Sequence, residues 1–169
     1  ICSGLVGSEM CIRDRHDNKQ SGYEFLYGIP GTIAGAVSMN AGAFEKEIMP
    51  YVHSLDLLDE NGMIYTLKNN EMSYSYRTSH IDKKSIIISV KLLKQKLNFD
   101  VNLLNLLNEK RKTSQPINQL SCGCIFKNPS GYHAAKLIDS AQLKGSRAGG
   151  IYISHKHSNY FINDGSGTY

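Results

Sequence analysis

A stretch of small residues at positions 28–43 constrains this chain more than any other segment. It reads GIPGTIAGAVSMNAGA and carries no charged side chain, whereas a flexible linker in solvent would carry Ser, Glu or Lys. Pro30 suits the first position of a helix, because its missing N–H would have no helical partner there in any case. The stretch therefore predicts a turn followed by a helix that begins near Gly31.

Two interpretations of this stretch stay open. The free N–H groups at a helix start attract phosphate, and Gly31 and Gly35 would leave one helix face bare to a ligand or to another backbone. The spacing matches neither G-x-G-x-x-G nor the P-loop motif. The stretch is either a tight helix-packing segment or a phosphate-binding loop.

Composition narrows the class of protein. The chain has 169 residues, enough for one domain or two small ones, with 41% hydrophobic and 20% charged residues, as in an ordinary globular protein. The net charge of +4 comes from scattered Lys and Arg, so we expect an anionic small molecule and no nucleic acid as partner. No apolar run approaches the roughly 18 residues of a membrane span, and no signal peptide is recognisable. We expect a cytoplasmic protein with four free thiols.

The two ends do not resemble the ends of a complete protein. The chain starts with Ile, and residues 1–15, ICSGLVGSEMCIRDR, follow neither a helix nor a strand period. We interpret them as a non-native segment and exclude them from the fold. Residues 163–169 carry turn-forming residues without a closing element, so we expect the natural protein to continue on both sides.

Periodicity and turn residues predict a mixture of strands and helices. Strands are expected over 52–58, 63–67, 85–93, 151–154 and 160–162, helices over 100–115 and 132–142, and loop or short helix over 68–79. The first two strands form a hairpin across the turn at 59–62. Asp100 is the expected N-cap of the first helix, and Pro116 ends it.

Two details of that helix, and the residues after the Gly-rich stretch, are also predicted. Leu103, Leu104, Leu106 and Leu107 should form the apolar face of the helix. The basic triplet at 110–112 most simply forms a solvated helix end, with a functional role as the alternative. Residues 45–47, Glu-Lys-Glu, should form a polar turn. We place a domain boundary near 94–98.

Three clusters could carry chemistry, and each has a plain alternative. Arg77, in the segment Tyr-Arg-Thr-Ser, can hold a carboxylate or an enolate with two donors, or it is a surface arginine. His155 and His157 could be ligands or bases, or surface residues.

Cys122 and Cys124 lie in the segment SCGCIFKNP at 121–129. No second cysteine pair or suitably spaced histidine completes a metal site, so we expect no metal. The thiols are either buried structural groups, or a tight turn at the intervening Gly presents one of them to a polar site. A thiol has an unperturbed pKa of about 8.5, so it is protonated at pH 7 and can donate a proton.

Taken in order, these pieces resemble the UDP-N-acetylenolpyruvoylglucosamine reductase family. The resemblance runs over about residues 17–166 and rests on GIPGTIAGAVSMNAGA, YRTS, a helix ending near Gln115-Pro116, SCGCIFKNP and LKGSRAGGIYISHKHSNYFIN. The segment from Tyr76 to Gln115 is short, and in this it resembles the family subtype that lacks an extra substrate-capping loop.

The resemblance implies an α+β fold with two domains. Residues 16–94 would be the second part of an FAD-binding domain of the vanillyl-alcohol-oxidase type, and residues 95–169 a truncated C-terminal substrate domain. It also implies a cytoplasmic, monomeric enzyme of peptidoglycan synthesis. In this family NADPH reduces FAD, and the flavin delivers hydride to C3 of UDP-N-acetylglucosamine enolpyruvate, which gives UDP-N-acetylmuramate.

The resemblance also assigns site residues. Negative charge that develops on C2 and its carboxylate must be stabilised, and C2 must be protonated. Arg77 matches the electrostatic residue, and Cys124 stands where the family usually has a Ser proton donor; we expect the two to converge on one double bond beside the flavin. The implied flavin-binding residues are Gly28, Ile29, Pro30, Gly31, Thr32, Gly35, Ala36, Asn40, Ala41 and Gly42, and the implied substrate-binding residues are Tyr76, Ser79, Lys127 and Asn128.

The chain departs from the family pattern in one further way. It has no Glu after Glu109, so the family's distal catalytic Glu is not found, and neither is the N-terminal Gly/Ser-rich phosphate loop. We therefore expect these 169 residues alone to be inactive and to bind FAD weakly or not at all. The rival interpretations are another flavin oxidase of the same superfamily and an inactive fragment or binding module.

Overall fold

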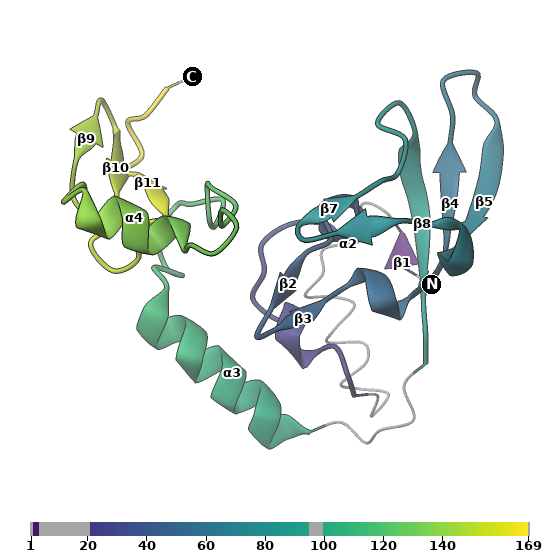
Figure 1. Cartoon of the computed structure of the whole chain (residues 1–169), viewed down its shortest axis with the longest axis horizontal. Coiled ribbons are helices and arrows are strands. Elements are labelled where there is room, and N and C mark those ends of the chain that lie inside the picture. Colours follow the sequence, from purple (N-terminus) through teal and green to yellow (C-terminus); the bar gives the residue numbers. More distant parts are fainter. Residues whose placement is uncertain (1, 4–20, 95–99, 169) are drawn as a thin grey trace. The chain divides into compact units, whose positions relative to one another are not determined.

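The computed structural model describes residues 2–3, 21–94 and 100–168 (Figure 1). The chain divides into two compact units, one up to Asn105 and one from Leu106 onward. The division falls inside the helix with which the second expected domain begins. The domain ranges 16–94 and 95–169 therefore stay predictions, and each unit is described by itself.

The first unit is built on a four-stranded antiparallel sheet. Its strand order is β1 (Cys2–Ser3), β8 (Ile86–Leu92), β4 (Val52–Leu58) and β5 (Ile64–Lys68). The predicted hairpin is confirmed as β4 and β5, and the predicted strand over 85–93 as β8. Asp59 Oδ1 closes the hairpin turn by accepting hydrogen bonds from the N–H groups of Asn61 (2.9 Å) and Met63 (2.8 Å).

The sheet includes two residues that the sequence analysis excluded. Cys2 pairs with Val90 and Ser3 pairs with Ser89. A two-residue pairing needs only backbone N–H and C=O groups, so it leaves no period in the sequence. Residues 1 and 4–15, the rest of the segment interpreted as non-native, lie outside the described residues.

The core of the first unit forms where one sheet face meets three short helices. These are η1 (Glu24–Leu26), α2 (Ile33–Ser38) and η2 (Met49–Tyr51). The buried apolar side chains are Tyr23, Phe25, Leu26, Ile33, Ala36, Val37, Ala41, Ile48, Met49, Val52, Leu55, Leu57 and Val90. Four residues of the Gly-rich stretch, Ile33, Ala36, Val37 and Ala41, thus contribute to the core.

The helix of the Gly-rich stretch begins two residues later than expected. Thr32 is its N-cap, and its Oγ1 accepts a hydrogen bond from the Gly35 N–H at 3.1 Å. Pro30 therefore precedes the helix and does not occupy its first position. Gly31 has φ of +128°, a conformation open essentially to glycine, and this turn delays the helix. A Cβ on Gly35 would lie only 3.3 Å from Thr32 Oγ1, so glycine there leaves room for the cap.

Two small hairpins complete the first unit. One joins β2 (Gly42–Ala43) to β3 (Lys46–Glu47), and the other joins β6 (Tyr74–Ser75) to β7 (Thr78–Ser79). The second hairpin follows η3 (Asn69–Glu71), so the loop or short helix expected over 68–79 is a short helix plus a hairpin.

The second unit combines helices with a three-stranded antiparallel sheet. Helix α3 (Val101–Ser114) and helix α4 (Ala134–Ser140) accompany strands in the order β11 (Phe161–Asn163), β10 (Ile151–Ile153) and β9 (Arg147–Ala148). Both predicted helices and both predicted strands are confirmed to within a few residues, whereas β9 was not predicted. Asp100 Oδ1 accepts a hydrogen bond from the Leu103 N–H at 3.0 Å, as expected of an N-cap.

Two expectations about α3 were wrong. Leu106, assigned to the apolar face, is 52% exposed, and Arg111, assigned to a solvated end, is only 5% exposed. Residues four apart lie on the same helix face, so Arg111 follows the buried Leu107. The basic triplet is therefore split, with its central cation turned inward.

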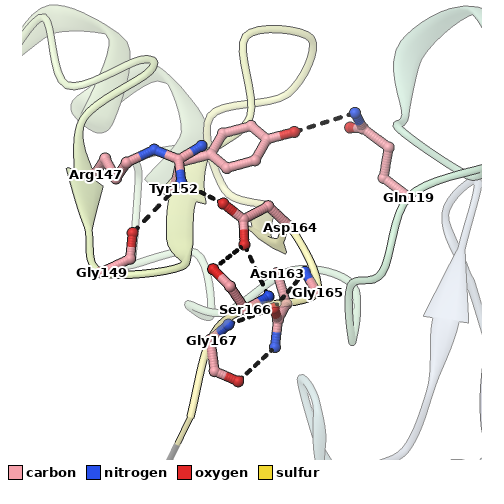
Figure 2. A network of polar contacts seen from close by, with 9 residues as sticks. All are labelled: Gln119, Arg147, Gly149, Tyr152, Asn163, Asp164, Gly165, Ser166 and Gly167. Carbon is pink, nitrogen blue, oxygen red and sulfur yellow. Dashed lines mark hydrogen bonds and ion pairs between the residues drawn. The ribbon is translucent and has the colours of Figure 1, made fainter.

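A polar network ties down the end of the second unit (Figure 2). Arg147 forms an ion pair with Asp164 and lies over the Tyr152 ring, 5.0 Å from its centroid. The Ser166 hydroxyl and the Arg147 guanidinium hold the pKa of Asp164 well below its usual range. Asn163 Oδ1 accepts hydrogen bonds from two glycine N–H groups, at 2.8 and 3.1 Å. The turn-forming residues at 163–168 thus fold back on the sheet.

Within the described residues, every helix is too short or too polar to reach across a lipid bilayer.

Candidate active site

Arg77 links the two small hairpins of the first unit. Its Nη2 donates a hydrogen bond to the Gly42 carbonyl at 2.7 Å, and its Nη1 pairs with Glu47 Oε1 at 3.2 Å. The guanidinium also lies over the Tyr76 ring, 4.9 Å from its centroid. With a side chain only 22% exposed, Arg77 is not an ordinary surface arginine. The Gly42 carbonyl and the Glu47 carboxylate hold its charge in one place.

Glu47 connects Arg77 to the buried Asn40. Glu47 Oε2 accepts a hydrogen bond from Asn40 Nδ2 at 2.8 Å, while Oε1 pairs with Arg77. Asn40 is fully buried, and its Nδ2 also donates to the Ser75 carbonyl at 3.0 Å. Sequence analysis assigned Glu47 only to a polar turn and missed this pairing. The available signal was the cluster of charged residues at 45–47 that follows a long uncharged stretch.

The backbone at Arg77 is unusual as well. Its φ of +53° lies in the left-handed region, which residues other than glycine rarely adopt and which recurs at functional sites. Gly42 has a complementary constraint: a Cβ there would overlap the Lys46 carbonyl oxygen and lie 2.9 Å from Arg77 Nη1. Only glycine at position 42 therefore allows the guanidinium its present approach.

The residues expected to bind flavin fall into three groups by exposure. Pro30, Gly31 and Gly35 are exposed, whereas Ala36, Asn40 and Ala41 are buried. The three buried residues pack inside the first unit. The three exposed residues form an uncharged surface without bulky side chains, which suits a flat ring or a phosphate. Gly28, Ile29, Thr32 and Gly42 are intermediate in exposure.

The residues on either side of Arg77 differ in their surroundings. Tyr76 is 48% exposed. Ser79 Oγ donates a hydrogen bond to the Ser38 carbonyl at 2.5 Å, which ties β7 to the end of α2. Their expected roles in substrate binding stay predictions.

Cys124 lies in a loop of the second unit, opposite Tyr160. The two residues form an isolated antiparallel bridge immediately before β11. Gly123 has φ of +91°, so the tight turn expected between the cysteines is confirmed. Both Cys122 and Cys124 are exposed, unoxidised thiols, which excludes the alternative of buried structural thiols.

Asn159 fixes the Cys124 loop in place. Its Oδ1 accepts a hydrogen bond from the Phe126 N–H at 2.9 Å, and its Nδ2 donates to the Phe126 carbonyl at 2.8 Å. The Asn159 carbonyl also accepts from the Ile125 N–H at 2.9 Å. Asn159 is only 3% exposed. Sequence analysis missed this residue, because its partners are about 33 positions away and no local pattern marks the contact.

Replacing Asn159 with alanine is expected to lower the free energy of unfolding by about 1–3 kcal/mol, because both polar groups of Phe126 lose their partner. Asn159→Asp keeps an acceptor for the Phe126 N–H but places a buried carboxylate beside the Phe126 carbonyl oxygen, so it should not recover the loss. Urea unfolding of the 169-residue chain measures both. Asn118→Ala, at an exposed position, is the matched control and should stay within about 0.5 kcal/mol of the parent. Equal losses of unfolding free energy in Asn159→Ala and Asn118→Ala would contradict the role of Asn159 in fixing the Cys124 loop.

The residues expected to contact substrate after Cys124 are both exposed. Asn128 Oδ1 accepts a hydrogen bond from the Ala134 N–H at 3.0 Å, so this side chain caps the start of α4. A substrate hydrogen bond from Asn128 would then come from its Nδ2. The expected substrate roles of Lys127 and Asn128 stay predictions.

The two histidines have different surroundings. His157 is half-buried, its Nδ1 accepts a hydrogen bond from the Asn159 N–H at 3.2 Å, and burial lowers its pKa. His155 is exposed, and its ring lies against Gly145, where a Cβ would collide with it. Across residues 2–3, 21–94 and 100–168, no group of three or more His, Cys, Asp or Glu side chains is arranged to hold a metal ion.

A hollow of about 470 Å³ opens elsewhere on the second unit. Lys112, His155 and Lys156 line it together with residues 115–119, 152 and 154. Two of its lining residues are joined by a hydrogen bond from Lys156 Nζ to the Lys112 carbonyl. No sequence pattern predicted it.

Comparison with known proteins identifies the second unit. Residues 115–169 match the family model described as the C-terminal domain of UDP-N-acetylenolpyruvoylglucosamine reductase. The fold and this match place the chain in the class of α+β proteins that carry that reductase domain.

Relatives match over both units. The chain is 42% identical to UDP-N-acetylenolpyruvoylglucosamine reductase of Caldanaerobacter subterraneus and 43% identical to that of Clostridium tetani, in each case over 88% of this chain and 50% of the relative. The crystal structure of the MurB reductase from Thermus caldophilus covers 95% of this chain with a TM-score of 0.85 at 31% identity, and this chain covers 60% of it.

The chain belongs to the UDP-N-acetylenolpyruvoylglucosamine reductase (MurB) family. It spans about half the length of the curated relatives that it matches.

Proposed function

We propose that this chain is part of an NADPH-dependent flavoenzyme that reduces UDP-N-acetylglucosamine enolpyruvate to UDP-N-acetylmuramate in peptidoglycan synthesis. The observation that carries the proposal is the 42% identity to reductases of this name across 88% of the chain, which includes the Gly-rich stretch as well as the Cys124 loop. We further propose that the first unit is the second part of an FAD-binding domain, and that the protein is a cytoplasmic monomer.

The residues of the first unit fit a flavin. The exposed part of the Gly-rich stretch presents backbone and small side chains without charge, so a planar ring or a phosphate could approach it closely. NADPH and FAD, when bound, supply the hydride that reaches C3 of the substrate. The other steps belong to side chains of this chain.

Arg77 would stabilise the charge that develops on the substrate. When hydride reaches C3, an electron pair moves toward C2 and its carboxylate, which gives an enolate. A guanidinium held by Glu47 and by the Gly42 carbonyl does not need to reorganise when that charge appears, and such preorganisation is the main source of electrostatic catalysis. Its planar group still offers further N–H donors to the carboxylate.

Cys124 would complete the reduction by protonating C2. The Sγ–H bond breaks, the proton forms the new C2–H bond, and the sulfur remains as a thiolate that solvent protonates again. Because a thiol is several pKa units more acidic than the alcohol of a serine, this transfer is chemically favourable. Convergence of Arg77 and Cys124 on one double bond is part of the proposal.

The direct test is turnover of UDP-N-acetylglucosamine enolpyruvate with NADPH. We expect activity from a protein of the relatives' full length that contains this sequence, and neither activity nor stoichiometric FAD binding from the 169 residues alone. A full-length protein that binds FAD and oxidises NADPH only with other acceptors would support the rival, another FAD-linked oxidoreductase. A full-length protein without flavin would support an inactive protein. A purified 169-residue chain with a stoichiometric flavin spectrum would contradict the expectation for the short chain.

A further inference from the structure

Tyr160 contacts the sulfur that the proposed function uses. The antiparallel bridge sets the two residues directly opposite each other, and a side-chain hydrogen bond to Cys124 contributes to the raised pKa of Tyr160, as expected when the phenol is the donor. Because Asn159, the residue before Tyr160, hydrogen-bonds to Phe126 just beyond Cys124, the fold holds the two segments that carry the phenol and the thiol against each other.

A buried cation adds to this pair. Arg111 of α3 is 5% exposed, and its charge acts on both Tyr160 and Cys124. Its Nη1 also donates a hydrogen bond to Gln115 Oε1 at 3.5 Å. Because charges interact more strongly away from bulk water, a guanidinium in this position favours negative charge on a nearby sulfur. The burial of Arg111, which the sequence did not predict, therefore has a chemical consequence: it places a positive charge near the Cys124 thiol.

We propose that Tyr160 and Arg111 are positioning residues that make Cys124 a better proton donor, by stabilising the thiolate that remains after the proton leaves. The inference rests on the proposed function for its role in catalysis, but the effect on the thiol is a property of this chain alone. No sequence pattern marked Tyr160, and Arg111 was noted only as part of the basic triplet at 110–112.

The electrostatics around the pair support this role. Burial, the neighbouring Cys124 and its hydrogen bond raise the pKa of Tyr160 to about 12, with Arg111 acting in the opposite direction. The phenol therefore stays protonated at neutral pH and remains a donor. His157 is a further titratable group beside Tyr160, with its ring 4.8 Å from the Tyr160 ring. Burial lowers its pKa, so it adds no positive charge at neutral pH.

The test measures the thiol directly in the 169-residue chain. With Cys2, Cys11 and Cys122 replaced by serine, the rate of alkylation by iodoacetamide against pH reports the apparent pKa of Cys124. Tyr160→Phe keeps the ring and removes the donor. We expect the apparent pKa to rise by about 0.5–1 unit, so that alkylation at pH 7 slows about 3- to 10-fold. Arg111→Met should shift it in the same direction, and Arg111→Lys should shift it less.

The matched control is Tyr132→Phe, because Tyr132 is a tyrosine of the same unit that is 65% exposed. This substitution should leave the pH dependence of Cys124 alkylation unchanged. If the profile of Tyr160→Phe coincides with that of Tyr132→Phe, the inference is overturned, even where Arg111→Met fails to fold.

A second measurement separates this inference from the proposed function. In the full-length enzyme, Tyr160→Phe should lower kcat and shift its pH dependence while KM changes little. If the parent enzyme does not reduce the enolpyruvyl substrate but the alkylation shift is present, the proposed function fails and the effect on the thiol stands. If the parent turns over and neither profile shifts, the inference fails and the proposed function stands.

Discussion

Replacing Cys124 with alanine in the full-length enzyme is expected to lower turnover by about 10²- to 10⁴-fold, the usual contribution of a positioned proton donor. Cys124→Ser should retain measurable turnover, because an alcohol can still deliver a proton, although less readily than a thiol. Reduction of the flavin by NADPH precedes C2 protonation, so its rate should be unchanged in both variants. Steady-state turnover together with stopped-flow flavin reduction checks both expectations.

The matched control for this experiment is Cys122→Ala. Cys122 is an exposed thiol two residues away, so its replacement should leave turnover near that of the parent. Alkylating reagents should inhibit the parent and the Cys122 variant alike. If Cys124→Ala turns over as fast as the parent, Cys124 has no part in the mechanism.

Replacing Arg77 with methionine is expected to reduce kcat by about 10²- to 10³-fold, the typical effect of removing one preorganised group that stabilises a developing anion. Arg77→Lys keeps the charge but cannot donate to a carboxylate in the same two-pronged way, so it should recover only part of this loss. The measurements are kcat and KM for the enolpyruvyl substrate, with urea unfolding of each variant to detect changes in stability.

Arg147 offers the matched control. Like Arg77, it pairs with a carboxylate and lies over a tyrosine ring, at 5.0 Å from Tyr152 (Figure 2). Arg147→Met should therefore lower stability by a similar amount, because it removes the same kind of ion pair and ring contact, while kcat stays near that of the parent. Equal kcat values for the two methionine variants would remove Arg77 from the proposed mechanism.

Local sequence patterns predicted several strands and helices correctly. The hairpin over 52–68 follows from β-branched and apolar residues on both sides of an Asp-Glu-Asn-Gly turn, and β8 from a run of isoleucines. Helix α3 follows from its Asp100 cap and from Pro116. In the hairpin and in α3 the deciding interactions join residues close in sequence, so a short window contains the cause. Strand β8 is marked by its β-branched residues, although its partner β4 is distant in sequence.

Two expectations were wrong because residue type alone does not show which way a helix face turns or which conformation a glycine adopts. Arg111 looked like a solvated charge because its neighbours are lysines, and its burial depends on the helix face that it shares with Leu107. The Gly-rich stretch suggested a helix from Gly31, but the left-handed turn at that glycine and the Thr32 cap moved the start.

The sequence by itself determined the α+β composition, the main strands and helices, and the order of motifs that marks the family, because these depend on local periodicity and on residue identity. Only the tertiary structure decided that Glu47 and Gly42 hold Arg77, and that Asn159 and Tyr160 hold the Cys124 loop. Those partners lie about 30 or more positions apart. No local pattern can therefore predict them, and their contacts form only when the chain has folded.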